Sequence, residues 1–314
     1  MSAECLVVTY HYVRDVETTP YPATKALGLR DFERQMDWLA RDRHPITFEL
    51  FEAAMRGGTE LPDRAALLTF DDGFVDHAET VTPALVARGW TGVFFVAGAT
   101  LDDPPCLLNV HKTQFLLAAL GASRFAAEVE GALAGSVAAG GGFRHRREVY
   151  RYDESPDVAA KHRLNYEMPP EAATLVLSAL FAAHIGDEQA FARELYVTPN
   201  QVRAMAQAGM TVGFHTERHP VLSRLLADGQ HDEVANGVAR IRALTGQRSV
   251  PFCYPYGHVH TYNADTIAVL DAAGYSLAFT TARRLVRPGE DRPFELPRID
   301  TRDLPPFSDG VLHA

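Results

Sequence analysis

The sequence predicts a parallel α/β fold with about seven strands, arranged either as a barrel or as a doubly wound sheet. Short apolar segments rich in β-branched and aromatic residues alternate with segments of helical periodicity. Such alternation is typical of parallel strands joined by crossover helices. It stops between residues 104 and 195, where helical segments predominate. At 314 residues the chain is long enough for one barrel or for two smaller domains.

The first third of the chain predicts strands and helices in strict alternation. Strands are expected at 5–10, 65–70 and 91–98, and helices at 31–42 and 79–89. Asp31 is the expected N-cap of the first helix, because its carboxylate can accept from free backbone N–H groups. Gly89 is expected to end the second helix, since glycine adopts the left-handed conformation that closes helices.

The middle of the chain, residues 104–195, predicts a mainly helical insertion. Helices are expected at 111–135 and 169–184, and Pro170 falls in the first turn of the second, where proline is favoured. The segment follows directly on the strand at 91–98, so it begins at the carboxyl edge of the sheet. We expect it to line the substrate site or to form a subunit contact of a homo-oligomer that does so.

The alternation resumes after residue 195. Helices are expected at 198–209, 228–245 and 263–274, and strands at 210–215, 249–257, 275–281 and 294–300. Thr198 and Asn263 are the expected N-caps of the first and third of these helices. Gly274 is expected to end the third helix.

Composition excludes several classes of function. Hydrophobic residues make up 46% and charged residues 22% of the chain, as in water-soluble globular proteins. The net charge of −10 argues against a general nucleic-acid or anionic-membrane binder. No apolar run reaches the ~18 residues of a membrane span. The stretch MSAECLVVTYHYV predicts a first strand rather than a signal peptide, so a cytoplasmic protein is expected.

Histidines and aspartates follow the predicted strands. In a parallel α/β fold, residues just beyond the carboxyl ends of strands face the active site. The polar residues in such positions are His11, Asp71, Asp72, His215, His219, Tyr256 and Arg298. The spacing of His215 and His219 suits one metal ion, and an aspartate from another strand would complete a two-histidine, one-carboxylate site. Three protein ligands and an open position are typical of hydrolytic metal centres.

Two motifs, TFDDG at 69–73 and HTERH at 215–219, resemble those of the polysaccharide deacetylase family, also named carbohydrate esterase family four. The resemblance implies an irregular (β/α)7 barrel formed by residues 1–103 and 196–314, interrupted by the insertion at 104–195. It implies that Asp72, His215 and His219 bind a divalent metal, commonly zinc, which cobalt or nickel could replace. It also implies that Asp71 is the general base.

A branch of that family offers a further resemblance. The stretch CYPYG at 253–257 has cysteine where other members have arginine, and TYHYV at 9–13 supplies a histidine that the C-terminal segment LPRID lacks. Both features resemble a permuted branch that deacetylates N-acetylglucosamine polymers. The resemblance implies that His11 is the general acid, that Arg298 orients Asp71, and that the Tyr256 backbone N–H polarises the substrate carbonyl.

Ordinary structural roles remain open for several of these residues. His11 could be a core histidine, and Arg298 could pair with Asp300 or Asp303. Tyr12, Tyr256 and Tyr262 could stack on sugar rings or could belong to the core. The aromatic residues therefore predict substrate binding only weakly.

The function expected from the sequence is metal-dependent removal of the N-acetyl group of a sugar. The substrate is expected to be a cytoplasmic nucleotide-linked, lipid-linked or small amino sugar of glycan or secondary metabolism. Two alternatives stay open. One is another amidohydrolase on the same scaffold, such as an N-deformylase or other N-deacylase. The other is a catalytically inactive sugar-binding protein.

Overall fold

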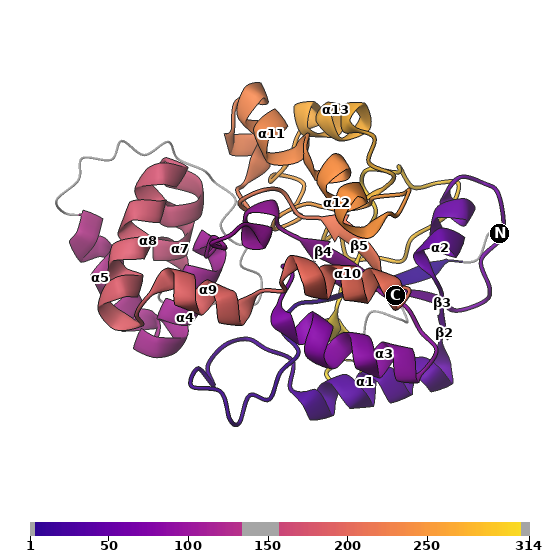
Figure 1. Ribbon diagram of the computed structural model, residues 1–314, viewed down its shortest axis with the longest axis horizontal. Helices are drawn as coiled ribbons and strands as arrows, with labels where there is room; N and C mark the ends of the chain where they lie inside the picture. The colour runs from indigo at the N-terminus through magenta and orange to yellow at the C-terminus, as the bar shows by residue number, and fades with distance from the viewer. Residues whose placement is uncertain (1–3, 134–156, 309–314) are drawn as a thin grey trace.

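A single parallel sheet organises the protein in the computed structural model, which describes residues 4–133 and 157–308 (Figure 1). Its strands lie in the order β7-β6-β5-β4-β3-β1-β8, and the short β2 pairs with the outer end of β3. Every pair of neighbouring strands is parallel, as the alternation of strands and helices predicts. The strands are β1 (Cys5–Tyr10), β2 (His44–Pro45), β3 (Ala65–Phe70), β4 (Val93–Val96), β5 (Thr211–Phe214), β6 (Phe252–Cys253), β7 (Ala278–Phe279) and β8 (Ile299–Asp300).

The two ends of the sheet meet. At one end β8 pairs with β1 through Val8 and Ile299. At the other end β7 contacts the segment just before β8, through a parallel bridge between Phe279 and Leu296. The segment that leads into β8 therefore touches both ends of the sheet, and the strands form a barrel. The prediction of an irregular (β/α)7 barrel is confirmed.

The helices surround the strands. They are α1 (Leu29–Asp42), α2 (Phe48–Met55), α3 (Thr82–Ala87), α4 (Asn109–Leu120), α5 (Ala122–Leu133), α7 (Val158–His162), α8 (Pro170–His184), α9 (Glu188–Leu195), α10 (Pro199–Gln207), α11 (Ala227–Val234), α12 (Gly237–Thr245) and α13 (Ala264–Ala273). Thr198 and Asn263 cap their helices through complete capping boxes, as predicted. None of these helices combines the length and apolar character needed to cross a bilayer.

Some boundaries differ from the predictions. The first helix begins at Leu29 with Gly28 as its N-cap, so Asp31 lies in the first turn and is not the cap. The helix expected at 228–245 is two helices, α11 and α12. The helix expected at 111–135 is divided at Gly121, whose φ of 75° is left-handed. Its last residues, like the rest of 134–156, lie outside the described part of the chain.

Both faces of the strands are buried, as expected for parallel sheets covered by helices. Alternate side chains of β1 pack in different clusters: Leu6 and Val8 contribute to the large cluster that includes residues of α1 and α10. Cys5 and Val7 contribute to a second cluster with Phe95 and other strand residues. The core therefore holds the strands from both sides and fixes the positions of their carboxyl ends.

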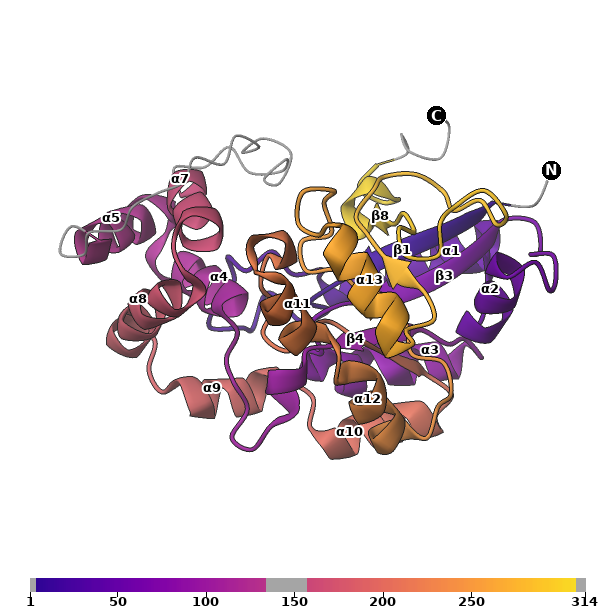
Figure 2. The ribbon, with the colours of Figure 1, turned by 90° about the horizontal axis from the view of Figure 1, so that it is seen from above.

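The helices of the insertion share a third apolar cluster with the barrel. Figures 1 and 2 show α4, α5, α7 and α8 together at one end of the molecule. Their buried residues pack with Tyr12, Phe74 and Ala97, which follow β1, β3 and β4 respectively. The insertion is thus packed against the carboxyl end of the barrel strands.

Candidate active site

Most of the polar residues selected from the sequence lie together at the carboxyl ends of the strands, but Arg298, expected to follow the last strand, directly precedes β8. His11 follows β1, Asp71 and Asp72 follow β3, and His215 follows β5. The four come from three separate strands, and their side chains approach to within 4 Å in pairs. Parallel pairing puts these strand ends on one edge, so residues distant in sequence form one site.

Asp72, His215 and His219 form a buried group that fits a metal ion. Their exposed fractions are 3%, 2% and 8%. Asp72 Oδ1 lies 3.5 Å from His215 Nε2 and 3.7 Å from His219 Nε2. This oxygen is buried and has no hydrogen-bond partner within residues 4–133 and 157–308. Such an oxygen is costly unless a cation or a water compensates it.

The hydrogen bond of His215 fixes the direction of its lone pair. His215 Nδ1 lies 2.7 Å from the Cys253 carbonyl oxygen, so Nδ1–H donates and Nε2 faces Asp72 as an acceptor. Two acceptors 3.5 Å apart require a positive charge between them. Burial alone would lower the pKa of His215, yet Cys253 and both aspartates raise it well above its usual value. A proton and a divalent cation would therefore compete for the position between His215 Nε2 and Asp72 Oδ1.

His219 completes the donor set as a neutral imidazole. Burial, with His215 beside it, lowers the pKa of His219 to about 3. A neutral imidazole is the form that binds metals. Two neutral histidines and one carboxylate are a donor set that zinc accepts.

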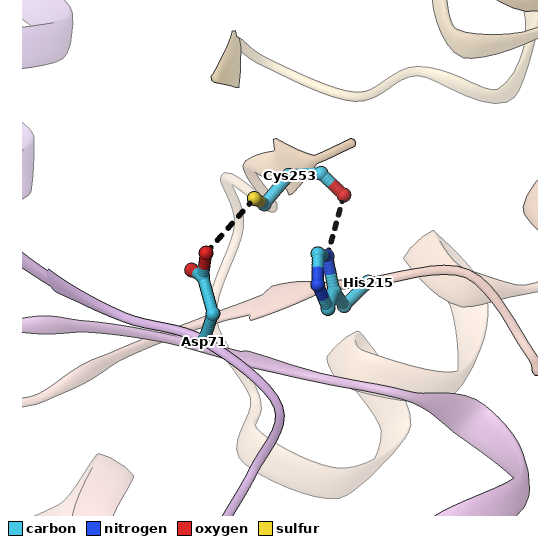
Figure 3. A group of neighbouring side chains, drawn as sticks. All are labelled: Asp71, His215 and Cys253. Carbon is cyan, nitrogen blue, oxygen red and sulfur yellow. Dashed lines mark hydrogen bonds between the residues drawn. The ribbon is translucent and has the colours of Figure 1, made fainter. Parts of the chain in front are cut away.

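A second group of possible ligands, Asp71, His215 and Cys253, is less suitable. Figure 3 shows Cys253 between the other two, with its thiol toward the carboxylate and its carbonyl toward the imidazole. His215 Nδ1 is already engaged by that carbonyl, and burial raises the pKa of the Cys253 thiol. Arg298 lies 3.0 Å from the sulfur, and its charge would repel a cation. The group of Asp72, His215 and His219 is therefore the better candidate for a metal site.

Asp71 is held by Arg298. The Arg298 guanidinium donates to both carboxylate oxygens, each at 2.8 Å, and both side chains are almost fully buried. The same guanidinium donates to the Thr69 hydroxyl and the Thr280 carbonyl. Burial alone would raise the pKa of Asp71, but Arg298 outweighs it and lowers that pKa to about 2. Asp71 is therefore ionised at neutral pH.

The backbone at the site is left-handed at four residues other than glycine. The φ angles of Asp72, Thr216, His219 and Tyr256 are 78°, 65°, 60° and 62°. L-residues adopt this region at a cost, and such residues concentrate at functional sites. The Thr216 hydroxyl accepts from the His219 N–H at 2.8 Å, which holds the turn between the two histidines.

Gly73 is required by the turn after Asp72. Its φ is 66°, and a Cβ at this position would lie 3.0 Å from Val96 Cγ1. A side chain there would push the turn away from β4. Glycine therefore lets the carboxylate pair sit close to the strand end.

His11 lies on the open side of the carboxylate pair. Its side chain is 44% exposed, and Nε2 is 3.9 Å from Asp71 Oδ2. Its backbone carbonyl accepts from the His77 ring at 3.0 Å, which fixes the main chain. The side chain can therefore reach a substrate that covers Asp71. The alternative that His11 is a buried core histidine is therefore wrong.

The three tyrosines predicted to bind substrate differ in exposure. Tyr12 is 5% exposed and stacks on Phe74, with 3.8 Å between ring centroids. Tyr262 is 8% exposed and stacks on Tyr254 at 4.1 Å. Tyr256 is partly exposed, and its ring centroid lies 5.0 Å from that of His219. Of the three, only Tyr256 is both partly exposed and close to His219. A sugar-binding role for Tyr12 and Tyr262 stays a prediction.

Sequence reasoning missed His111, which lies in α4. Its Nε2 is 3.2 Å from Asp72 Oδ2, and its Nδ1 is 2.6 Å from the Tyr196 hydroxyl. Burial alone would raise the pKa of Asp72, but His111, with the other histidines, holds it well below its usual range. The sequence offered only a histidine on the buried face of a helix, a signal shared with ordinary core histidines.

Comparison with known proteins identifies a matching family. Residues 170–278 match the family model described as polysaccharide deacetylase. The matched range includes HTERH and CYPYG but neither TFDDG nor the N-terminal YH. Over 101 residues, or 32% of this chain, the sequence is 31% identical to the poly-beta-1,6-N-acetyl-D-glucosamine N-deacetylase of Escherichia coli. The match spans only 15% of that protein's length.

Solved structures share the fold over nearly the whole chain. The Streptococcus pyogenes deacetylase PplD, in complex with acetate, superposes with a TM-score of 0.61 at 16% identity, covering 99% of this chain and 97% of its own. A de-N-acetylase from Aggregatibacter actinomycetemcomitans gives a TM-score of 0.58 at 17% identity, with 95% of each chain covered. At these identities the likeness concerns the fold.

Proposed function

We propose that the chain is a metal-dependent N-deacetylase that hydrolyses the N-acetyl amide of a sugar, and the match of residues 170–278 to the polysaccharide deacetylase model supports this. One observation carries the proposal. The unpartnered oxygen of Asp72 faces two imidazole nitrogens, directly beside a carboxylate that Arg298 keeps ionised. A cation site next to a buried base is what amide hydrolysis by water requires.

Asp72, His215 and His219 would hold the ion, which we propose to be zinc. When bound, the ion supplies a Lewis acid that eases deprotonation of water and polarises the amide carbonyl. Asp72 contributes the one negative charge of the set, and the two imidazoles contribute lone pairs. Cobalt or nickel would fit the same donors.

Asp71 would act as the general base. Its carboxylate accepts a proton from the attacking water, whose oxygen forms the new bond to the amide carbon. Arg298 donates to both oxygens of Asp71, so the base is oriented before substrate arrives. The thiol of Cys253 occupies little volume, which supports the role of Arg298, because the guanidinium lies against that sulfur.

Tyr256 and His11 would complete the reaction. The Tyr256 backbone N–H would donate to the carbonyl oxygen as it becomes negative. His11, in its protonated form, would give a proton to the amide nitrogen as the carbon–nitrogen bond breaks. The products are acetate and the free amino sugar. The exposure of His11 beside Asp71 supports this role, since an acid must reach the departing amine.

The substrate is proposed to be an N-acetylated amino sugar of the N-acetylglucosamine type. The name of the Escherichia coli relative, which acts on poly-β-1,6-N-acetyl-D-glucosamine, supports the sugar. For the carrier we retain the proposal of a nucleotide-linked, lipid-linked or small soluble saccharide. The packed rings of Tyr12 and Tyr262 leave Tyr256 as the best-placed platform for a sugar ring.

Release of acetate tests the proposal directly. The zinc-loaded protein would be incubated with N-acetylglucosamine, its β-1,6 oligomers and a nucleotide-linked form, and acetate and free amine would be measured. We expect both products in equal amounts from at least one substrate, and their loss in Asp71→Asn. Asp63→Asn, a carboxylate-to-amide change near the opposite end of β3, is the matched control and should stay active.

Other outcomes point to the alternatives. Release of formate or another acid in place of acetate would assign the protein to a different N-deacylase activity. Saccharide binding without any hydrolysis by the metal-loaded protein would indicate a sugar-binding protein and overturn the proposal.

A further inference from the structure

We propose that His111, contributed by the helical insertion, is a positioning residue that orients the metal-ligating carboxylate of Asp72. The inference rests on the proposed metal site and deepens it. His111 holds one oxygen of Asp72, so the other oxygen is presented to the metal. The insertion thereby becomes part of the metal centre, in addition to any role in substrate choice.

The two oxygens of Asp72 have different surroundings. Oδ2 lies 3.2 Å from His111 Nε2, whereas Oδ1 faces His215 and His219 at 3.5 and 3.7 Å. Among the described residues, the groups whose ligand atoms all lie within 4.8 Å of one another do not include His111. His111 therefore acts through Asp72 and not as a further ligand.

A directed chain of hydrogen bonds fixes the tautomer of His111. The Leu108 backbone N–H donates to the Tyr196 hydroxyl oxygen at 3.1 Å. The hydroxyl proton is then directed to His111 Nδ1, 2.6 Å away. With Nδ1 as an acceptor, the imidazole carries its proton on Nε2. This buried nitrogen has no hydrogen-bond partner of good geometry among the described residues, and Asp72 Oδ2 lies 3.2 Å from it, so a small rotation of the carboxylate would complete the contact. Tyr196 thus sets the polarity of the contact without touching Asp72.

Packing holds this chain rigid. His111 is completely buried, and its ring centroid lies 4.8 Å from that of Phe74 and 5.5 Å from that of Tyr196. Phe74 forms an antiparallel bridge with Tyr196, and the Val197 N–H donates to the Gly73 carbonyl at 2.9 Å. The end of the insertion is therefore hydrogen-bonded to the turn that carries Asp72.

Side chains that hold metal ligands have measurable effects on affinity. Mutating a residue that supports a metal ligand from outside typically weakens metal binding by about 10–100-fold, because the ligand loses its orientation. For Asp72 the loss would free the carboxylate to rotate and to expose either oxygen. A change in geometry should accompany the loss in affinity.

The experiment measures metal binding without substrate. Zinc affinity of the folded, full-length protein would be measured by competition with a chromogenic chelator, and the visible spectrum of the cobalt-loaded protein would be recorded. His111→Leu should bind zinc about 10–100-fold more weakly and show an altered cobalt spectrum. His111→Gln, whose amide nitrogen can donate from about the position of Nε2, should recover much of the affinity. Tyr196→Phe should weaken binding in the same direction but less.

Phe115→Leu is the matched control. It truncates a buried ring on the same helix without contacting Asp72, so it should lower thermal stability and leave zinc affinity within about twofold. Zinc affinity and a cobalt spectrum like those of wild type in His111→Leu would overturn the inference. An equal loss of zinc affinity in Phe115→Leu would also overturn the inference, because it would show that any disturbance of this helix weakens binding and that His111 has only a structural role. These measurements use no substrate. Their outcome therefore does not depend on whether deacetylation of a sugar is detected.

Discussion

Replacing Arg298 with methionine should destabilise the protein strongly, because it leaves the carboxylate of Asp71 buried without its counter-charge. Arg298 and Asp71 are each 2% exposed, so water cannot replace the lost partner. Breaking one side of a buried ion pair typically costs about 3–5 kcal/mol. The Thr69 hydroxyl and the Thr280 carbonyl also lose a donor, which places the expected loss toward the upper end.

The magnitude converts to a change in melting temperature. An unfolding entropy of about 2.1 cal/mol/K per residue gives about 0.66 kcal/mol/K for a chain of 314 residues. A loss of about 3–5 kcal/mol then lowers Tm by about 5–8 °C if the protein unfolds cooperatively. The double variant Asp71→Asn with Arg298→Met carries no unpaired charge. It should be at least about 2 kcal/mol more stable than the sum of the two single changes predicts.

Urea denaturation followed by circular dichroism would measure these free energies of unfolding. A chelator should be present throughout, so that differences in metal affinity do not contribute to stability. Arg56→Met is the control, because Arg56 is 64% exposed and pairs with Glu52 on the surface. It should cost no more than about 1 kcal/mol. A loss below about 1 kcal/mol in Arg298→Met, or strict additivity in the double variant, would refute the reasoning.

Three further predictions concern the proposed reaction. Asp71→Asn should keep the metal and lose about 10²–10⁴-fold in turnover, the usual contribution of a general base; loss of the metal would instead identify Asp71 as a ligand. Chelation should abolish deacetylation and added zinc should restore it, whereas full activity in protein shown by elemental analysis to be metal-free would exclude the mechanism. His11→Ala should lose most turnover on an N-acetyl sugar but much less on an activated ester, whose leaving group needs no proton. Equal losses on the two substrates would indicate that His11 positions the substrate.

Much of the site follows from periodicity and strand ends. Strand ends brought Asp71, Asp72, His215 and His219 together as candidates, the family resemblance implied Asp72, His215 and His219 as the metal ligands, and the structure places the possible ligand atoms of these three within 4.8 Å of one another. The helix caps at Thr198 and Asn263 are local chemistry, which the sequence specifies without help from the fold. Predictions of this kind depend on short-range rules that tertiary contacts do not reverse.

Other features depend on contacts that no local pattern reveals. His111 is 39 residues from Asp72 in sequence, in a helix whose position on the barrel depends on packing with Phe74 and Tyr12. The pairing of Arg298 with Asp71 in place of Asp300 or Asp303 likewise depends on how the sheet closes. The division of residues 228–245 into α11 and α12 is also tertiary, because a single helix matches the same periodicity.

Closure of the barrel has a consequence for the order in which the protein becomes active during synthesis. Arg298 lies 227 residues after Asp71, within the segment that joins the two ends of the sheet. On the ribosome, the metal ligands and His11 emerge well before this segment. Until it emerges, Asp71 has no counter-charge and β1 lacks its β8 neighbour. A nascent chain that stops before residue 296 would therefore carry all of the proposed metal ligands on an open sheet, and the proposed reaction could begin only when the last strand is in place.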